Sequence, residues 1–107
     1  GETVIDDAGE LRVKESDRIA TTVAMLRGFG VVAEARGDGL VVAGRGRRTL
    51  AAAHVDSAGD HRIAMSAAVL ALVADGPTRI EDVDNVATSY PGFVDALRGL
   101  GADLRVE

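Results

Sequence analysis

The stretch Leu11-Arg-Val-Lys-Glu-Ser-Asp-Arg18 carries five charged residues in eight and marks the point where the first long helix is expected to begin. Ser16 or Asp17 offers a side-chain oxygen that can cap the helix N-terminus. Beyond this cap, apolar or small residues recur at steps of four, three and four, at Ile19, Val23, Leu26 and Gly30. This spacing predicts one buried helical face, and glycines at 28 and 30 predict where the helix ends.

The flanks of this helix read as strands. β-Branched or alternating runs predict strands at Thr3–Ile5 and Leu11–Val13, and a hairpin whose arms are Val31–Ala35 and Leu40–Ala43. The basic segment Gly44–Arg48 is interpreted as a solvated loop, since it lacks the ending that a phosphate-binding loop needs. Residues 49–53 fit a short strand or an irregular link equally well.

A second helix is expected over Asp60–Ala74, with Asp60 as its N-cap. From Ile63 onward this helix is apolar on nearly every side, and such helices are buried. A domain this small offers little to bury it, so we expect partner elements outside this chain. Thr78–Val83 then predicts a strand, Pro91 the first position of a helix, and Leu104–Val106 a last strand.

The predicted order is strand, helix, hairpin, helix, strand, helix, strand. Helices and strands alternate, but the hairpin interrupts a purely parallel pattern. The sequence therefore predicts an α/β or α+β domain, with helices packed on a small mixed sheet.

Composition narrows the class of protein. The 107 residues fit one domain, and 47% of them are apolar, as in soluble globular proteins. The formal charge of −5 argues against nucleic-acid binding, which requires concentrated positive charge.

The sequence contains no cysteine, as expected for a protein of the cytoplasm. The longest apolar run, Ile63–Ala74, is too short to span a membrane, and no signal peptide is visible. Gly1 is not an initiator residue, so we expect a chain that is processed, tagged or cut from something longer.

The first charged stretch has the chemistry of an anion site. A helix N-terminus carries partial positive charge and unpaired N–H groups, and Lys14 and Arg18 add two full charges. Arg18 can hold a carboxylate or phosphate with two parallel bonds. Glu15, among these cations, is a candidate proton carrier. The alternative interpretation is a solvated helix start with exposed ion pairs that contribute little.

A second cluster, Asp60-His61-Arg62, repeats this arrangement at the start of the apolar helix. His61 and Arg62 are therefore candidate binding residues, with a structural role for His61 as the alternative. His54 is interpreted as a loop residue. A metal site is not expected, because the two histidines are seven residues apart with no second carboxylate at ligand spacing.

Together these motifs resemble the 5-enolpyruvylshikimate-3-phosphate synthase family. The resemblance rests on the stretch 11–18, on Asp-His-Arg-Ile-Ala-Met at 60–65 and on Ala-Thr-Ser-Tyr-Pro-Gly-Phe at 87–93, and it extends from Gly9 to Val106. The related UDP-N-acetylglucosamine enolpyruvyl transferases share the fold but not this triple signature. They remain an alternative that substrate binding would separate.

The resemblance implies a reaction and residue roles. Such enzymes transfer the enolpyruvyl group of phosphoenolpyruvate to the 5-hydroxyl of shikimate 3-phosphate and release phosphate, without a metal or organic cofactor. By motif, Lys14 would contact shikimate 3-phosphate, and Glu15 would handle the proton at the methylene carbon of phosphoenolpyruvate. Arg18 and Arg62 would bind the phosphoenolpyruvate anion, supported by His61. Many members carry a lysine where this chain has Thr88, and Lys14 is its only lysine. The glyphosate response therefore stays open.

The resemblance also implies that the chain is incomplete. Family members fold into two domains, each of three βαβαββ units, with the site between them. Residues 1–107 correspond to about the last quarter, a single C-terminal fragment that lacks the general base and several substrate ligands. We therefore expect its partner to be the missing N-terminal part and the isolated fragment to be inactive. The alternative is a non-catalytic anion-binding or interaction module.

Overall fold

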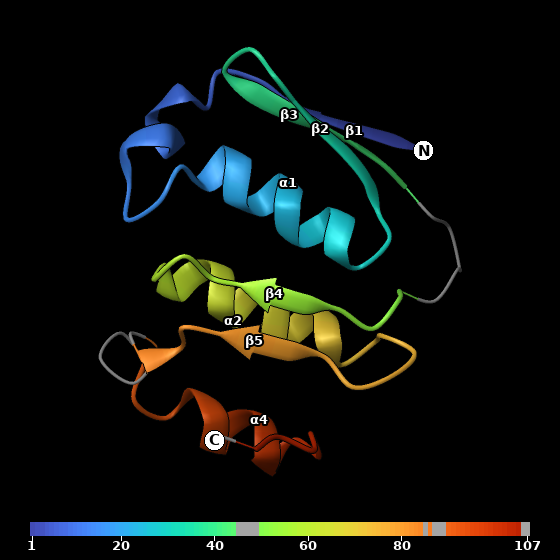
Figure 1. Ribbon diagram of the computed structural model, residues 1–107, viewed down its shortest axis with the longest axis vertical. Coiled ribbons are helices and arrows are strands. Elements are labelled where there is room, and N and C mark those ends of the chain that lie inside the picture. Colours follow the sequence, from blue (N-terminus) through green and yellow to red (C-terminus); the bar gives the residue numbers. More distant parts are fainter. Residues whose placement is uncertain (45–49, 85, 87–89, 106–107) are drawn as a thin grey trace.

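Helix α1 (Arg18–Gly28) lies at the centre of the computed structural model, between a three-stranded sheet and a second layer of helix and strands (Figure 1). The structure describes residues 1–44, 50–84, 86 and 90–105. The remaining elements, in chain order, are β1 (Glu2–Ile5), the 3₁₀-helix η1 (Gly9–Val13), β2 (Val32–Arg36), β3 (Gly39–Ala43), β4 (His54–Asp56), α2 (His61–Ala71), β5 (Arg79–Glu81) and α4 (Phe93–Gly99).

The first sheet is antiparallel, in the order β1-β3-β2. In its register, Val42 of the central strand β3 pairs with Thr3 of β1 on one side and with Ala33 of β2 on the other. The predicted hairpin of β2 and β3 is therefore confirmed, and β1 pairs with the outer edge of β3. The second sheet is a parallel pair, β4 with β5, in which Val55 faces Ile80. The mixed α/β class predicted from the sequence is confirmed.

Helix α1 is buried on two faces. Ile19 and Val23 pack against Ala33 and Leu40 of the antiparallel sheet. One turn further on, Met25 and the helix-capping Phe29 form a second buried cluster with residues of β4 and α2, namely Val55, Ile63 and Ala67. The sequence predicted the first face but not the second. This second face holds the two layers together.

Both ends of α1 follow the sequence signals. The Asp17 side chain caps the N-terminus by accepting a hydrogen bond from the Ala20 N–H at 3.2 Å. At the other end Gly30 has a φ of 82°. This left-handed conformation lets the Val31 N–H bond to the Leu26 carbonyl at 3.0 Å, which satisfies one of the last helical carbonyls.

Four local predictions were wrong. Leu11–Val13 lies in η1 rather than a strand, and His54 begins β4 rather than lying in a loop. Leu104 and Arg105 form no strand, whereas Val106 lies outside the described residues. Pro91 precedes the N-cap Gly92 of α4 instead of opening the helix. Short apolar runs are poor predictors because their conformation depends on which segment pairs with them.

Helix α2 is shorter and more exposed than its composition predicted. It ends at Ala71, and its buried residues lie on one side, at Ile63, Ala64, Ala67 and Ala68. Val69, Leu72 and Val73 are half exposed or more. Val69 lies in the last turn of α2, and Leu72 and Val73 follow directly after the end of this helix. Nothing within the described residues covers this apolar surface.

Candidate active site

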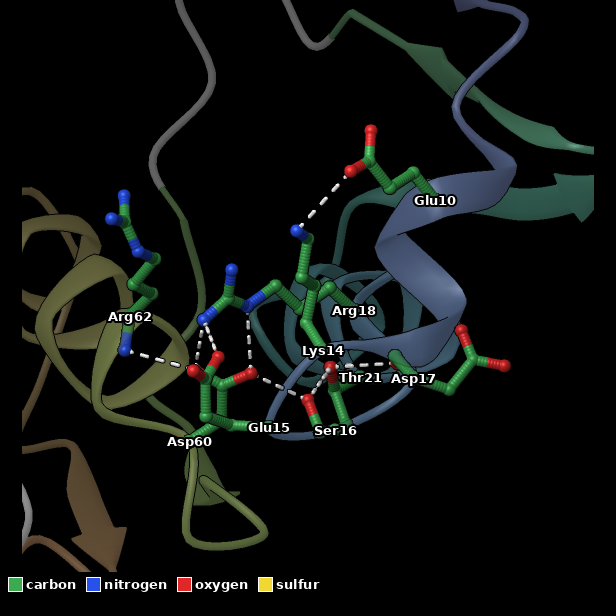
Figure 2. A network of polar contacts seen from close by, with 9 residues as sticks. All are labelled: Glu10, Lys14, Glu15, Ser16, Asp17, Arg18, Thr21, Asp60 and Arg62. Carbon is green, nitrogen blue, oxygen red and sulfur yellow. Dashed lines mark hydrogen bonds and ion pairs between the residues drawn. The ribbon is translucent and has the colours of Figure 1, made fainter.

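The two charged clusters predicted from the sequence meet at the N-termini of α1 and α2. Arg18, the first residue of α1, donates from Nε to Asp60 Oδ2 at 2.9 Å across 42 residues of sequence. The Arg18 Nη2 group lies 3.4 Å from the other carboxylate oxygen. Figure 2 shows this contact joining the two helix starts. The packing of α1 against α2 through the Phe29 cluster places them together.

A tight turn between β4 and α2 positions Asp60. Ala58 and Gly59 both have left-handed backbone conformations, with φ of 54° and 73°. The Asp60 N–H closes the turn by donating to the Ser57 carbonyl at 2.9 Å. Ser57 is itself fully buried and donates from Oγ to the Asp82 carbonyl at 2.6 Å. Hydrogen bonds within the turn and from the turn to Asp82 therefore fix the backbone position of Asp60.

Asp60 is fully buried, and both oxygens of its carboxylate accept hydrogen bonds. Besides Arg18, it accepts from Ser16 Oγ at 2.6 Å and from the Arg62 N–H at 3.0 Å, which makes it the N-cap of α2. Burial alone would raise the pKa of Asp60, but the bonds from Arg18, Ser16 and the Arg62 N–H outweigh it and leave the pKa lowered. Asp60 is therefore a buried carboxylate held in its charged form.

Glu15 shares the Arg18 guanidinium with Asp60. The Glu15 carboxylate forms a close ion pair with Arg18 Nη2, and half of the Glu15 side chain is exposed. The pKa of Glu15 is lowered, first by a hydrogen bond from its own backbone and also by the charges of Arg18 and His61. The pKa of Arg18 is raised, mainly by its hydrogen bond to Asp60.

The other predicted site residues lie around this pair without bonding to it. Lys14 is exposed and its Nζ lies 3.5 Å from Glu10, away from Asp60 (Figure 2). Arg62 reaches Asp60 only through its backbone, and its side chain points away. His61 opens α2 and is partly exposed. The clusters are thus brought together, and only Arg18 and Glu15 among the predicted residues are in direct side-chain contact.

Two contributors were missed in the sequence. Asp60 was predicted only as a helix cap, and Ser16 only as a candidate cap for α1. Ser16 instead bonds to Asp60, and its Oγ also lies 3.1 Å from Thr21 Oγ1. Asp60 could have been predicted as a site residue, because it directly precedes the candidate binding residues His61 and Arg62 in the sequence. Nothing local in the sequence indicated the role of Ser16.

Two hollows of the surface lie away from the two helix starts. They are lined by residues of α1 and of strands β2 and β3, and Arg27 and Glu34 line both. In the described part of the chain, no three His, Asp or Glu side chains gather as a metal site. Nor does any described helix have the length and apolar character needed to cross a membrane. Residues 87–89 of the third motif, including Thr88, lie outside the described residues.

The geometry fits the chemistry predicted for these residues. At the adjoining N-termini of two helices, the Arg18 guanidinium contacts the half-exposed Glu15 carboxylate, and the side chains of Lys14 and Arg62 extend away from it (Figure 2). Such a place favours an anion, because the helix ends add partial positive charge. Of the two carboxylates that contact Arg18, Glu15 is the one that is open to solvent.

Comparison with known proteins gives one consistent result. A sequence profile of EPSP synthase (3-phosphoshikimate 1-carboxyvinyltransferase) matches residues 1–97. The 3-phosphoshikimate 1-carboxyvinyltransferase of Halorhodospira halophila is 50% identical over 107 residues, which cover all of this chain and 24% of the relative. That of Phenylobacterium zucineum is 47% identical over 104 residues, covering 97% and 23%.

Comparison with solved structures points to the same family as the sequence comparison. Two EPSP synthase structures from Acinetobacter baumannii superpose with TM-scores of 0.90 and 0.87, at 32% and 38% sequence identity. They match 100% and 92% of this chain, which spans only 24% and 23% of their own lengths. The chain thus covers about a quarter of its relatives. The matched profile, the sequence relatives and the shared fold together show that this chain belongs to the EPSP synthase family.

Proposed function

We propose that this chain forms the C-terminal quarter of an enzyme that transfers the enolpyruvyl group of phosphoenolpyruvate to the 5-hydroxyl of shikimate 3-phosphate and releases phosphate. The observation that carries the proposal is the 2.9 Å bond between Arg18 and Asp60. It joins two motifs that are typical of this family but lie far apart in sequence. Family membership supplies the reaction.

Each candidate residue has a role in this proposal. Arg18 and Arg62 bind the phosphoenolpyruvate anion, because guanidinium groups match carboxylates and phosphates. Lys14 contacts shikimate 3-phosphate, and His61 supports the same pocket. Glu15 carries the proton to and from the methylene carbon through its exposed carboxylate.

The rest of the enzyme is the partner that this proposal requires. The chain spans about a quarter of its relatives and would form one wall of a cleft between two domains. The substrates would lie between this wall and the missing one, in a cytoplasmic enzyme. We therefore predict that the isolated 107-residue chain does not release phosphate from the two substrates.

A chimera tests the proposal. The chain replaces the matching 24% of the Halorhodospira halophila relative, with which it aligns along its full length. We expect the chimera to release phosphate from phosphoenolpyruvate and shikimate 3-phosphate, whereas the 107-residue chain alone stays at the blank rate. The same chimera with Glu15→Gln should lose most of its kcat, by roughly 10²-fold or more, if Glu15 transfers the proton.

Two results would count against it. A folded chimera without phosphate release would remove the assigned function. An unchanged kcat in the Glu15→Gln chimera would remove the proton role of Glu15 and leave the rest. Glu10→Gln is the matched control, because Glu10 is an exposed carboxylate five residues earlier that contacts Lys14 and not Arg18.

A further inference from the structure

The hydrogen bonds of Arg18 divide its guanidinium into three parts. Nε bonds to Asp60 alone, at 2.9 Å. Nη2 is shared between Asp60, at 3.4 Å, and the closer Glu15 carboxylate. Nη1 has no hydrogen-bond partner among the described residues, and Figure 2 shows it directed away from both carboxylates. An arriving anion thus finds one open nitrogen and one that is occupied by Glu15.

The two carboxylates hold Arg18 with very different strength. Asp60 is fully buried and has two further anchors, namely Ser16 Oγ at 2.6 Å and the Arg62 N–H at 3.0 Å, the bond that caps α2. Removing it from Arg18 would leave a buried charge without its main partner, which is costly. Glu15 is 52% exposed, and Arg18 is its one ion-pair partner in the described part of the chain. An exposed pair of this kind breaks at little cost.

We propose that Arg18 is a clamp with one permanent and one exchangeable partner: Asp60 positions the guanidinium, and Glu15 occupies Nη2 only until a substrate anion replaces it. This inference rests on the proposed function and adds the order of events at the same site. Binding the anion through Nη1 and Nη2 releases Glu15, the proton carrier, as the substrate arrives. Asp60 is then a positioning residue that acts through Arg18.

Anion affinity separates the two partners. In the chimera, the Kd of phosphoenolpyruvate is measured by titration calorimetry without shikimate 3-phosphate, so that no turnover occurs. If Glu15 competes with the anion, Glu15→Gln should tighten binding by about fivefold, the worth of an exposed ion pair. Glu10→Gln removes the same charge from a carboxylate that does not contact Arg18, and should change the Kd by less than about twofold.

A double-mutant cycle identifies Arg18 as the group that is exchanged. In an Arg18→Gln background there is no guanidinium to free, so Glu15→Gln should give no more than the Glu10→Gln change. An equal gain with and without Arg18 would show simple charge repulsion and overturn the exchange. No measurable binding in any variant would overturn it as well, because Glu15→Gln is expected to open Arg18 to the anion.

The positioning role of Asp60 is tested by the solvent exchange of the Arg18 Nε–H. The Arg18 Nε–H signal in NMR should be protected from solvent exchange both with and without phosphoenolpyruvate, and this protection should be lost in Asp60→Asn. Asp17→Asn is the matched control, since Asp17 caps α1 but does not touch Arg18. An Nε–H signal that exchanges freely in the unsubstituted chimera would overturn the positioning role.

The outcomes remain distinguishable. If Asp60→Asn fails to fold, the Glu15 arm still decides the exchange, because it leaves Asp60 intact. Absence of phosphate release by the chimera argues against the proposed function, whereas the calorimetric cycle reports on the clamp independently of turnover. Normal turnover by the unsubstituted chimera, together with an unchanged Kd in its Glu15→Gln variant, overturns the clamp alone.

Discussion

At the scale of single residues, Asp60 has the largest set of roles in this chain. It caps α2, it accepts from Ser16 and it holds Arg18, all while fully buried. A buried charge is tolerated only when it is paired and hydrogen-bonded. Asp60 meets this requirement through four donor groups from two helices and one loop. Its effect on stability should therefore be large and dependent on pH.

We expect Asp60→Asn to lower the free energy of unfolding by roughly 3 kcal/mol, because Arg18 loses its buried counter-charge. The pKa of Asp60 is lowered in the folded chain, so its contribution is complete well above the unfolded value of 3.8 and is lost as the pH falls from 3.8 through the lower pKa of the folded chain. Urea unfolding at a series of acidic pH values measures this. An acid dependence in Asp60→Asn as steep as in the parent chain would contradict the assignment.

Gly39 is required by close approach between strands β1 and β3. A Cβ at this position would lie 1.7 Å from the Ile5 carbonyl oxygen, which belongs to the backbone and cannot move aside. Gly39→Ala should therefore destabilise the chain by about 3 kcal/mol or prevent β1 from pairing. Thermal unfolding measures the loss.

Gly28→Ala provides the control for this substitution. Its Cβ would meet only the Ala53 side chain, at 3.7 Å, within helix α1. Because alanine is the better helix former, the change should stabilise the chain by up to about 1 kcal/mol. Equal effects of the two substitutions would show that the Gly39 contact does not constrain the fold.

At the scale of elements, α1 organises the molecule by packing on two sides. Ile19 and Val23 face the antiparallel sheet, and Met25 and Phe29 face the second layer. The charged stretch directly before α1 is thereby placed beside the start of α2. The site thus depends on the second apolar face of α1 as much as on the charged residues themselves.

Phe29→Ala should therefore affect the fold and the site together. Phe29 is fully buried between α1, β4 and α2, and its loss should cost about 4 kcal/mol. The change should also weaken the Arg18–Asp60 bond, visible as faster exchange of the Arg18 Nε–H. Phe29→Leu, which keeps most of the apolar volume, should retain slow exchange. Slow exchange in a folded Phe29→Ala variant would show that the two helix starts are held by other contacts.

At the scale of the whole molecule, the chain leaves apolar side chains exposed on a face at the C-terminal end of α2. Val69, Leu72 and Val73 of the α2 segment are 51%, 50% and 61% exposed. Large apolar patches on a monomer often mark interaction surfaces. Under the proposed function, the rest of the enzyme would cover these side chains.

Without that cover, we expect the 107-residue chain to associate with itself as its concentration rises. Light scattering after gel filtration should show an increasing mass, and Val69→Lys with Val73→Lys should reduce it. Val13→Lys is the control, because Val13 is 81% exposed but lies in η1, away from this face. A monomer at all concentrations, or equal effects of both changes, would contradict the expectation.

Local signals in the sequence were sufficient for much of this chain. Asp17 and Asp60 were predictable as helix caps, Gly30 as a helix end and the two arms as a hairpin, because each depends on residues a few positions apart. The charged residues before α1 and α2, with the third motif, also indicated the family. What they could not indicate is which side chains touch.

Contacts between distant segments were decided by the tertiary structure alone. Arg18 and Asp60 are 42 residues apart, and Ser16 and Asp60 are 44 apart. The conformations of residues 11–13 and of His54 likewise depend on the segments that surround them. By itself, the sequence determined where the helices start and which charges stand there. Only the packing of α1 against two layers decided that Asp60 would be buried between those starts and hold Arg18, because burial and pairing arise from the assembled chain.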